Sequence, residues 1–203
     1  MAMASEKGHV RRLPDTDADG RKSLGMTFFL LSSTMAFGGL LVLYGLLRRD
    51  APAWPPPGGR MLPLGLAAAA TASITVSSMT LHAGVRAVLR PRARLLFPWL
   101  IATLALGLTF VALELALWLD LGSGGFVPGA GNRQAGIFYV LTGFHFAHVL
   151  TAVALLLWLV PGARRERYHA NDSVRVRLVA RFWHFLGINW ALLFVAFFVW
   201  QRG

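Results

Sequence analysis

Five long runs of apolar residues, separated by short polar stretches, dominate the chain. Each run meets the length of roughly 20 residues that a helix needs to cross a hydrocarbon core about 30 Å thick. The runs are continuous and lack the alternation of barrel strands, and only helices or closed barrels satisfy their backbone in lipid. The pattern therefore predicts an all-α fold, a polytopic membrane helix bundle of five transmembrane helices. The predicted spans cover residues 24–47, 61–88, 95–121, 134–160 and 179–200.

The beginning of the chain has a different composition. Residues 1–23 mix acidic and basic side chains with little apolar content, which is typical of a solvated segment that buries no core. We expect a polar cytoplasmic tail over residues 1–23. Residues 24–203 are then expected to form one five-helix transmembrane domain.

Composition and charge agree with a membrane protein and set its expected orientation. The chain is 56% hydrophobic and 14% charged, with a net charge of +11. In a soluble protein such a charge favours nucleic-acid binding. Here 15 of the 20 Lys and Arg residues fall on one side of the predicted spans, counting the tail and the second and fourth connections. The positive-inside rule accounts for this asymmetry, so we expect a cytoplasmic N-terminus, a C-terminus outside, and no nucleic-acid partner.

Two histidines, His145 and His148, interrupt the fourth apolar run. An ionisable side chain at membrane depth is costly unless it faces protein, and residues at i and i+3 share a helix face. Metal or haem ligation is one interpretation, because imidazole is a common ligand for both. Structural hydrogen bonding is favoured, because Glu114 is the only carboxylate at membrane depth, whereas Asp120 lies at the interface near the end of the third span. The chain also lacks cysteine, which excludes disulfides, thiolate metal sites and a Cys nucleophile.

Other polar positions allow two interpretations each. Glu114 could serve in a proton relay or contact a lipid headgroup or a helix end. The favoured interpretation is a buried acid that is hydrogen-bonded to a neighbouring helix. His82 and His184 lie toward the same side and could clamp a b-type haem, although interfacial hydrogen bonding is favoured. Arg164 and Arg165 belong to the basic cluster after the fourth span, which reports topology or holds anionic lipid headgroups.

Several short motifs match a known family in the correct order. The run F-Y-V-L-T-G-F-H-F-A-H-V at 138–149 resembles the T-G-F-H-G-x-H-V signature of subunit III of haem-copper oxidases, the cytochrome c oxidase subunit III family. The likeness covers nearly the whole chain after Gly25, in the short five-helix form that lacks the two leading helices. Weaker matches are R-F-W-H-F-L-G-I-N-W at 181–190, V-S-S-M-T-L-H-A at 76–83, S-S-T-M-A-F-G-G at 32–39, and Thr103, Leu106, Gly107 and Phe110.

The chain departs from the family at polar positions. Ser33 stands where the family usually has a glutamate, and Phe146 replaces the glycine between the paired histidines. The family's Gln-x-x-Glu pair appears as Glu114 and Leu117. The usual buried acid is thus missing from one helix, and an acid appears on another. The polar-core candidates are Ser33, His82, Glu114, His145, His148 and His184.

The resemblance implies a non-catalytic accessory subunit of a terminal oxidase in aerobic respiration, whose complex reduces O2 to water and pumps protons. It implies a multi-pass protein of the bacterial inner membrane that packs mainly on subunit I, with subunit II and small subunits nearby. Haem and copper would lie in those partners, with no cofactor, catalytic residue or metal ligand in this chain. Bound phospholipids are implied, with Arg164 and Arg165 as headgroup candidates. Alternatives are a companion of nitric oxide reductase or, less favoured, a b-type membrane cytochrome.

Overall fold

The computed structural model describes residues 16–56, 59, 61–90, 92–129 and 132–200. Five long helices account for most of these residues, with short helical turns at Ala93–Leu95 and Ala170–Asp172. The last helix continues through Val195–Val199 in a wider turn. The helices are α1 Thr16–Arg49, α2 Leu64–Leu89, α3 Leu96–Ser123, α4 Arg133–Arg164 and α5 Val174–Phe194.

The prediction of an all-α bundle with five membrane-spanning helices is confirmed. All five helices are long and apolar enough to cross a membrane, and the described residues form no strand. The helices generally extend beyond the predicted spans. α1 begins at Thr16, so the end of the predicted tail is helical, and Asp17 and Asp19 lie in its first turn where the helix dipole favours negative charge. Residues 1–15 of that tail lie outside the described part of the chain.

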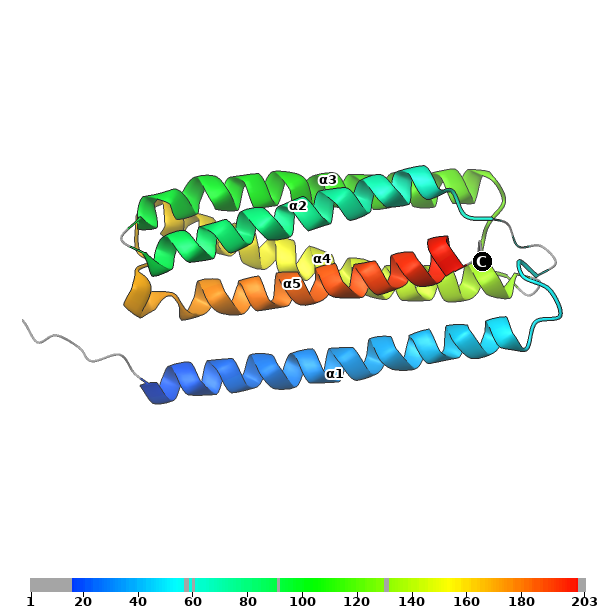
Figure 1. The fold of residues 1–203 in the computed structure, drawn as a ribbon, viewed down its shortest axis with the longest axis horizontal. Coiled ribbons are helices and arrows are strands. Elements are labelled where there is room, and N and C mark those ends of the chain that lie inside the picture. The colour runs from blue at the N-terminus through cyan, green and yellow to red at the C-terminus, as the bar shows by residue number, and fades with distance from the viewer. Residues whose placement is uncertain (1–15, 57–58, 60, 91, 130–131, 201–203) are drawn as a thin grey trace, which may run out of the picture.

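The helices run side by side in one elongated bundle (Figure 1). α2 and α3 form the most extensive pair, and α5 packs against α2 and α4. α1 lies on the outside of the bundle, against α5 and α4. The core that could hold a site is therefore the four-helix part, α2 to α5.

α1 joins this four-helix part through aromatic contacts at several depths. Phe29 meets Phe182 edge to face, with ring centroids 5.4 Å apart. Near the other end the hydroxyl of Tyr44 donates a hydrogen bond to the backbone oxygen of Ala196 (2.9 Å). Offset and edge-to-face ring pairs contribute packing energy beyond their buried area. These contacts hold α1 in place although its outer face is free.

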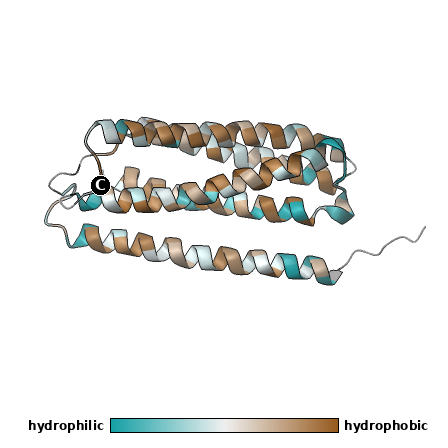
Figure 2. Cartoon of the chain, turned by 180° about the vertical axis from the view of Figure 1, so that it is seen from behind, coloured by the Kyte–Doolittle hydropathy of each residue, from teal (hydrophilic) through white to brown (hydrophobic). Residues whose placement is uncertain are grey.

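The outer surface of the bundle is apolar along its middle. Large hydrophobic side chains stand exposed on every helix, among them Met35, Met79 and Leu119. In Figure 2 hydrophilic residues gather toward the two ends of the bundle, and hydrophobic ones fill the length between. A soluble protein rarely exposes so much contiguous apolar surface. This distribution fits a bundle surrounded by lipid or by other membrane helices.

The basic connections meet at one end. The α2–α3 and α4–α5 connections are joined by an ion pair between Arg94 and Glu166, with nitrogen and oxygen 3.2 Å apart. The start of α1 lies at the same end, where the guanidinium of Arg181 donates to the hydroxyl of Ser23 (3.2 Å). The sequence assigned these basic connections to one side of the membrane. In the structure they lie at one end of the bundle.

Candidate functional site

Two tryptophans of α5 attach that helix to α2. The indole nitrogen of Trp183 donates a hydrogen bond to the hydroxyl of Ser77 (2.8 Å). One heptad further, the indole nitrogen of Trp190 donates to the hydroxyl of Thr71 (2.9 Å). Both indoles are fully buried. A buried indole N–H requires an acceptor, and the hydroxyl residues of α2 supply it. The family-like segments 76–83 and 181–190 are therefore in direct contact.

α3 is attached to α2 by hydroxyl groups as well. The hydroxyl of Ser73 donates to the backbone oxygen of Leu106 (2.8 Å). The hydroxyls of Thr80 and Thr103 lie 2.8 Å apart within hydrogen-bonding geometry. Small and hydroxyl side chains let membrane helices approach closely and exchange hydrogen bonds. These residues contribute to the extensive contact between α2 and α3.

Gly107 allows α3 to pack on the ring of Trp183. A Cβ atom added at Gly107 would lie 2.6 Å from Cη2 of that indole, closer than carbon atoms approach one another. Phe110, one turn along, meets Trp190 edge to face with centroids 4.8 Å apart. The family-like positions of α3 therefore form the surface that receives both tryptophans.

His145 lies at the centre of the bundle in an aromatic enclosure. Its side chain is fully buried, and its ring centroid is 6.1 Å from Phe37, 6.0 Å from Phe110 and 5.5 Å from Trp190. Neither ring nitrogen forms a hydrogen bond within the described part of the chain. The enclosure brings together side chains of α1, α3 and α5, so His145 marks the point where these helices converge.

Glu114 is the second buried polar group without a partner. It lies on α3 one turn after Phe110 and is fully buried, and neither carboxyl oxygen is hydrogen-bonded to any described residue. Glu114 and His145 therefore do not bond each other, although both lie on facing helices near Phe110. Most buried polar groups in proteins have a partner, so the four buried polar atoms of Glu114 and His145 that lack one among the described residues are unusual.

His148 has different surroundings from His145 although it lies on the same helix. Its Nδ1 atom is 2.8 Å from the backbone oxygen of Phe144, at hydrogen-bond distance. Its ring lies near Phe29 and Phe182, with centroids 6.1 and 6.3 Å away. His148 therefore belongs to the seam between α4, α1 and α5. The ring of Phe37 lies between the two histidines, with its centroid 6.1 Å from His145 and 5.5 Å from His148.

His82 and His184 face each other across α2 and α5, with ring centroids 6.3 Å apart. His184 is half-buried and His82 is exposed, so His82 lies outside the core in which we expected it. Both line an open cavity of about 480 Å³ together with Thr75, Ser78 and Met79. Within the described ranges no group of three or more His, Cys, Asp or Glu residues could hold a metal ion.

The remaining candidates lie apart from these groups. Ser33 is buried on α1. Arg164 and Arg165 are exposed where α4 ends, and Arg165 caps that helix through its backbone. Their guanidinium groups form no ion pair with any described acid. Their position at the basic end suits a contact with headgroups.

The sequence did not predict the hydroxyl-to-indole pairs of α2 and α5. It pointed to Ser77, Trp183 and Trp190 only as members of the motifs at 76–83 and 181–190. The available signal was the seven-residue spacing of Trp183 and Trp190, which places both indoles on one face of α5. A face with two indole N–H groups in lipid requires two acceptors on a neighbouring helix.

Substituting Glu114 by methionine is expected to stabilise the chain, because the unpaired buried carboxyl is replaced by an apolar side chain of similar length. A buried polar group without a partner costs about 1–3 kcal/mol, so Glu114→Met should raise the free energy of unfolding in detergent by that amount. Leu117→Met, at a buried position of the same helix, is the control and should cost less than about 1.5 kcal/mol. A loss of stability in Glu114→Met larger than in the control would mean that the carboxyl has a partner.

The arrangement matches a known family over almost the whole described chain. The family model for cytochrome c oxidase subunit III matches residues 16–202. The cytochrome c oxidase subunit 3 of Thermostichus vulcanus is 33% identical over 96% of this chain and 92% of that protein. A probable cytochrome c oxidase subunit 3 of Nocardia farcinica is 30% identical over 93% of each chain. A probable quinol oxidase subunit 3 of Staphylococcus haemolyticus is 25% identical over 87% of each.

The motif segments of α2, α3 and α5 form the contacts among these three helices, the segment 138–149 lies on α4, and the family match covers residues 16–202. The chain belongs to the cytochrome c oxidase subunit III family.

Proposed function

We propose that this chain is a non-catalytic accessory subunit of a haem-copper terminal oxidase. The observation that carries the proposal is the family match over residues 16–202. The interior of the bundle supports it, because hydroxyl, indole and aromatic contacts fill the space between the helices. The complex as a whole would carry out O2 reduction and proton pumping, with haem and copper in its other subunits.

The exposed apolar surface supports a role in assembly. The outer face of α1 presents large side chains such as Phe28 and Met35. The catalytic subunit I is the proposed main contact, with subunit II and small subunits nearby. Phospholipids would cover the remaining apolar surface, and Arg164 and Arg165 would hold headgroups where α4 meets the aqueous phase.

The proposed location is the bacterial inner membrane, with the N-terminus in the cytoplasm. The support is the concentration of basic residues at the end where α1 begins and where the α2–α3 and α4–α5 connections meet. Positively charged connections remain on the cytoplasmic side during membrane insertion. In this orientation the C-terminus lies outside.

Two other functions give distinct outcomes in the same preparation. A companion of nitric oxide reductase would have the same fold with a different catalytic partner. A b-type cytochrome would use His82 and His184 as haem ligands. The observation that favours this function is the 6.3 Å distance between the centroids of the two imidazole rings. Against it, the side chain of His82 is exposed.

Co-purification tests the partner directly. Membranes containing a tagged chain are solubilised in mild detergent, and the proteins retained with the chain are identified by mass spectrometry. We expect the catalytic subunit of a haem-copper oxidase in near-equal amount. Recovery of a nitric oxide reductase subunit instead would assign the chain to that enzyme. Recovery of the chain alone from well-solubilised membranes would contradict an accessory role.

A further inference from the structure

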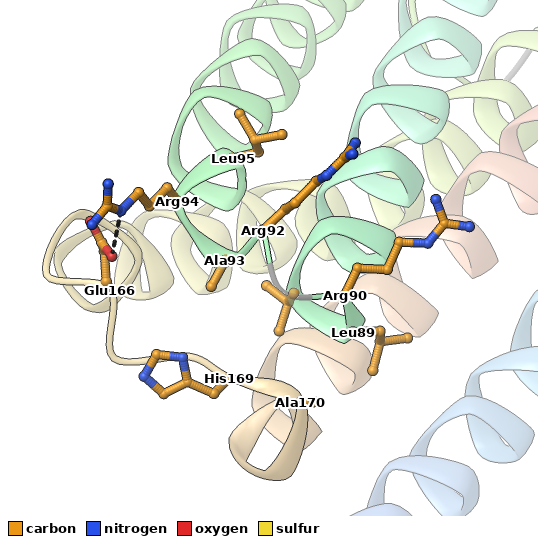
Figure 3. A pocket seen from close by; sticks show the side chains of 10 residues that line it. Leu89, Arg90, Arg92, Ala93, Arg94, Leu95, Glu166, His169 and Ala170 are labelled. Carbon is orange, nitrogen blue, oxygen red and sulfur yellow. Dashed lines mark hydrogen bonds and ion pairs between the residues drawn. The ribbon is translucent and has the colours of Figure 1, made fainter.

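Three arginines surround a small groove at the basic end of the bundle. Arg86 lies in the last turn of α2, and Arg90 and Arg92 lie in the connection to α3. All three line one cavity of about 290 Å³. Figure 3 shows the side chains of Arg90 and Arg92 extending to the same side, while Arg94 turns the other way toward Glu166.

No described acidic residue neutralises the charge of this groove. Arg94 is paired with Glu166 at 3.2 Å, but Arg86, Arg90 and Arg92 form no ion pair with any acid of the described segments. All three are exposed. By helical rise Arg86 lies about 6 Å deeper along α2 than Arg90. In the membrane orientation proposed above, on which this inference rests, the three charges span the level where α2 leaves the hydrocarbon core and arginine side chains extend toward headgroups.

The groove continues into the apolar part of the bundle. Its inner wall is made by Met79 and Ala83 of α2 and by Leu95 and Trp99 from the α3 side. Gly84 lets the two helices approach here, since a Cβ atom added to it would lie 3.1 Å from Cβ of Trp99. Met79 and His82 also line the next cavity, deeper along α2, so the two cavities are contiguous.

We propose that this groove binds an anionic phospholipid, with its phosphate on Arg86, Arg90 and Arg92 and one acyl chain against Ala83, Met79 and Trp99. Arginine binds phosphate oxygens through pairs of parallel hydrogen bonds, and three arginines that line one groove without an ion pair to a described acid favour an anionic headgroup over a zwitterionic one. The apolar continuation favours a lipid over free phosphate. His82, one turn below Arg86, lies at the depth of the glycerol ester oxygens. The site is separate from Arg164 and Arg165.

The test measures lipid binding to the full chain. The chain is purified in mild detergent, stripped of lipid, and titrated with phosphatidylglycerol, phosphatidylcholine or inorganic phosphate while native mass spectrometry counts bound molecules. The groove variant combines Arg86→Gln, Arg90→Gln and Arg92→Gln. The matched control combines Arg94→Gln, Arg167→Gln and Arg177→Gln, which removes the same charge from the same end outside the groove.

We expect the groove variant to lose about tenfold or more in affinity for phosphatidylglycerol, because several charge-assisted hydrogen bonds are removed. The control should stay within about twofold, since exposed charges outside the groove contribute little. Phosphatidylcholine should bind the unmodified chain more weakly. Equal losses in both triple variants would overturn the proposal. Displacement of phosphatidylglycerol by millimolar inorganic phosphate would assign the site to free phosphate and overturn the lipid assignment.

A second measurement places the lipid without any substitution in the groove. Phosphatidylglycerol with a photoactivatable group in one acyl chain is crosslinked to the unmodified chain in membranes, and the labelled peptides are sequenced. We expect labels on the segments that contain Met79 and Trp99. Labels confined to the outer face of α1 or to α4 would contradict the proposal. Because this experiment uses the natural sequence, a folding defect in the arginine variants cannot affect it.

Discussion

Gly107→Val is expected to destabilise the bundle by about 3 kcal/mol, the upper part of the range for an over-packed core. The first added carbon would overlap Cη2 of Trp183, since it would lie only 2.6 Å from that atom. The indole cannot move away freely, because its nitrogen is hydrogen-bonded to Ser77 and its ring is buried. The free energy of unfolding, measured with denaturant in detergent micelles, reports this loss.

The matched control is Gly39→Val on α1, where an added Cβ meets no atom within 4 Å. Both variants place a β-branched residue in a helix, so the control removes the effect of helix propensity. We expect the control to lose less than about 1 kcal/mol. Similar losses in the two variants would mean that α3 and α5 do not pack through Gly107.

Trp183→Ala is expected to cost about 3–5 kcal/mol, because it removes a fully buried indole and leaves a cavity between α2, α3 and α5. Trp183→Phe keeps most of the ring and loses the hydrogen bond to Ser77. Hydrogen bonds between membrane helices contribute about 0.6 kcal/mol on average, so most of the larger loss is packing. If Trp183→Phe lost as much stability as Trp183→Ala, packing of the ring would not be the main contribution of Trp183.

The same pair of positions permits a direct test of contact. If the valine at position 107 is destabilising only because it meets the indole, then combining Gly107→Val with Trp183→Ala should cost less than the sum of the two single losses. Residues in contact commonly show such coupling, in the range of about 0.5–3 kcal/mol. If the two stability losses were strictly additive, the side chains at positions 107 and 183 would not be in contact.

The five helices could be predicted from the sequence because the length of each apolar run matches the thickness of the hydrocarbon core that a helix must cross. Their ends could not, because a helix continues wherever its backbone and caps allow. α1 starts at Thr16, with acidic residues suited to a helix N-terminus, and α4 continues past Pro161 to Arg164. At the start of α1 and at the end of α4, the helix extends beyond the apolar run from which it was predicted.

The surroundings of the polar residues were less accessible to sequence reasoning. The spacing of His145 and His148 placed them on one helix face, but that face meets two different seams, one toward Trp190 and one toward Phe182. Similarly, His82 and Glu114 are both ionisable residues within predicted spans, yet His82 is exposed and Glu114 is buried. Which of them turns inward depends on how each helix rotates against its neighbours, and a single chain's pattern does not specify that rotation.

The pairing of hydroxyls with indoles depends on relative depth as well as rotation. Thr71 and Ser77 lie on α2, and their partners Trp190 and Trp183 follow more than a hundred residues later. Each residue type was visible in the sequence, but the register between α2 and α5 is set by packing around small residues such as Gly107. The family resemblance identified the segments, and the structure assigned the contacts.

The most direct test of an accessory role is a reduced-minus-oxidised absorbance spectrum, recorded on the purified complex and on this chain after it is separated from its partners. We predict haem bands in the complex and none in the separated chain. A haem Soret band that stays with the separated chain, and disappears in a His82→Ala, His184→Ala variant, would contradict the account and identify the chain as a cytochrome.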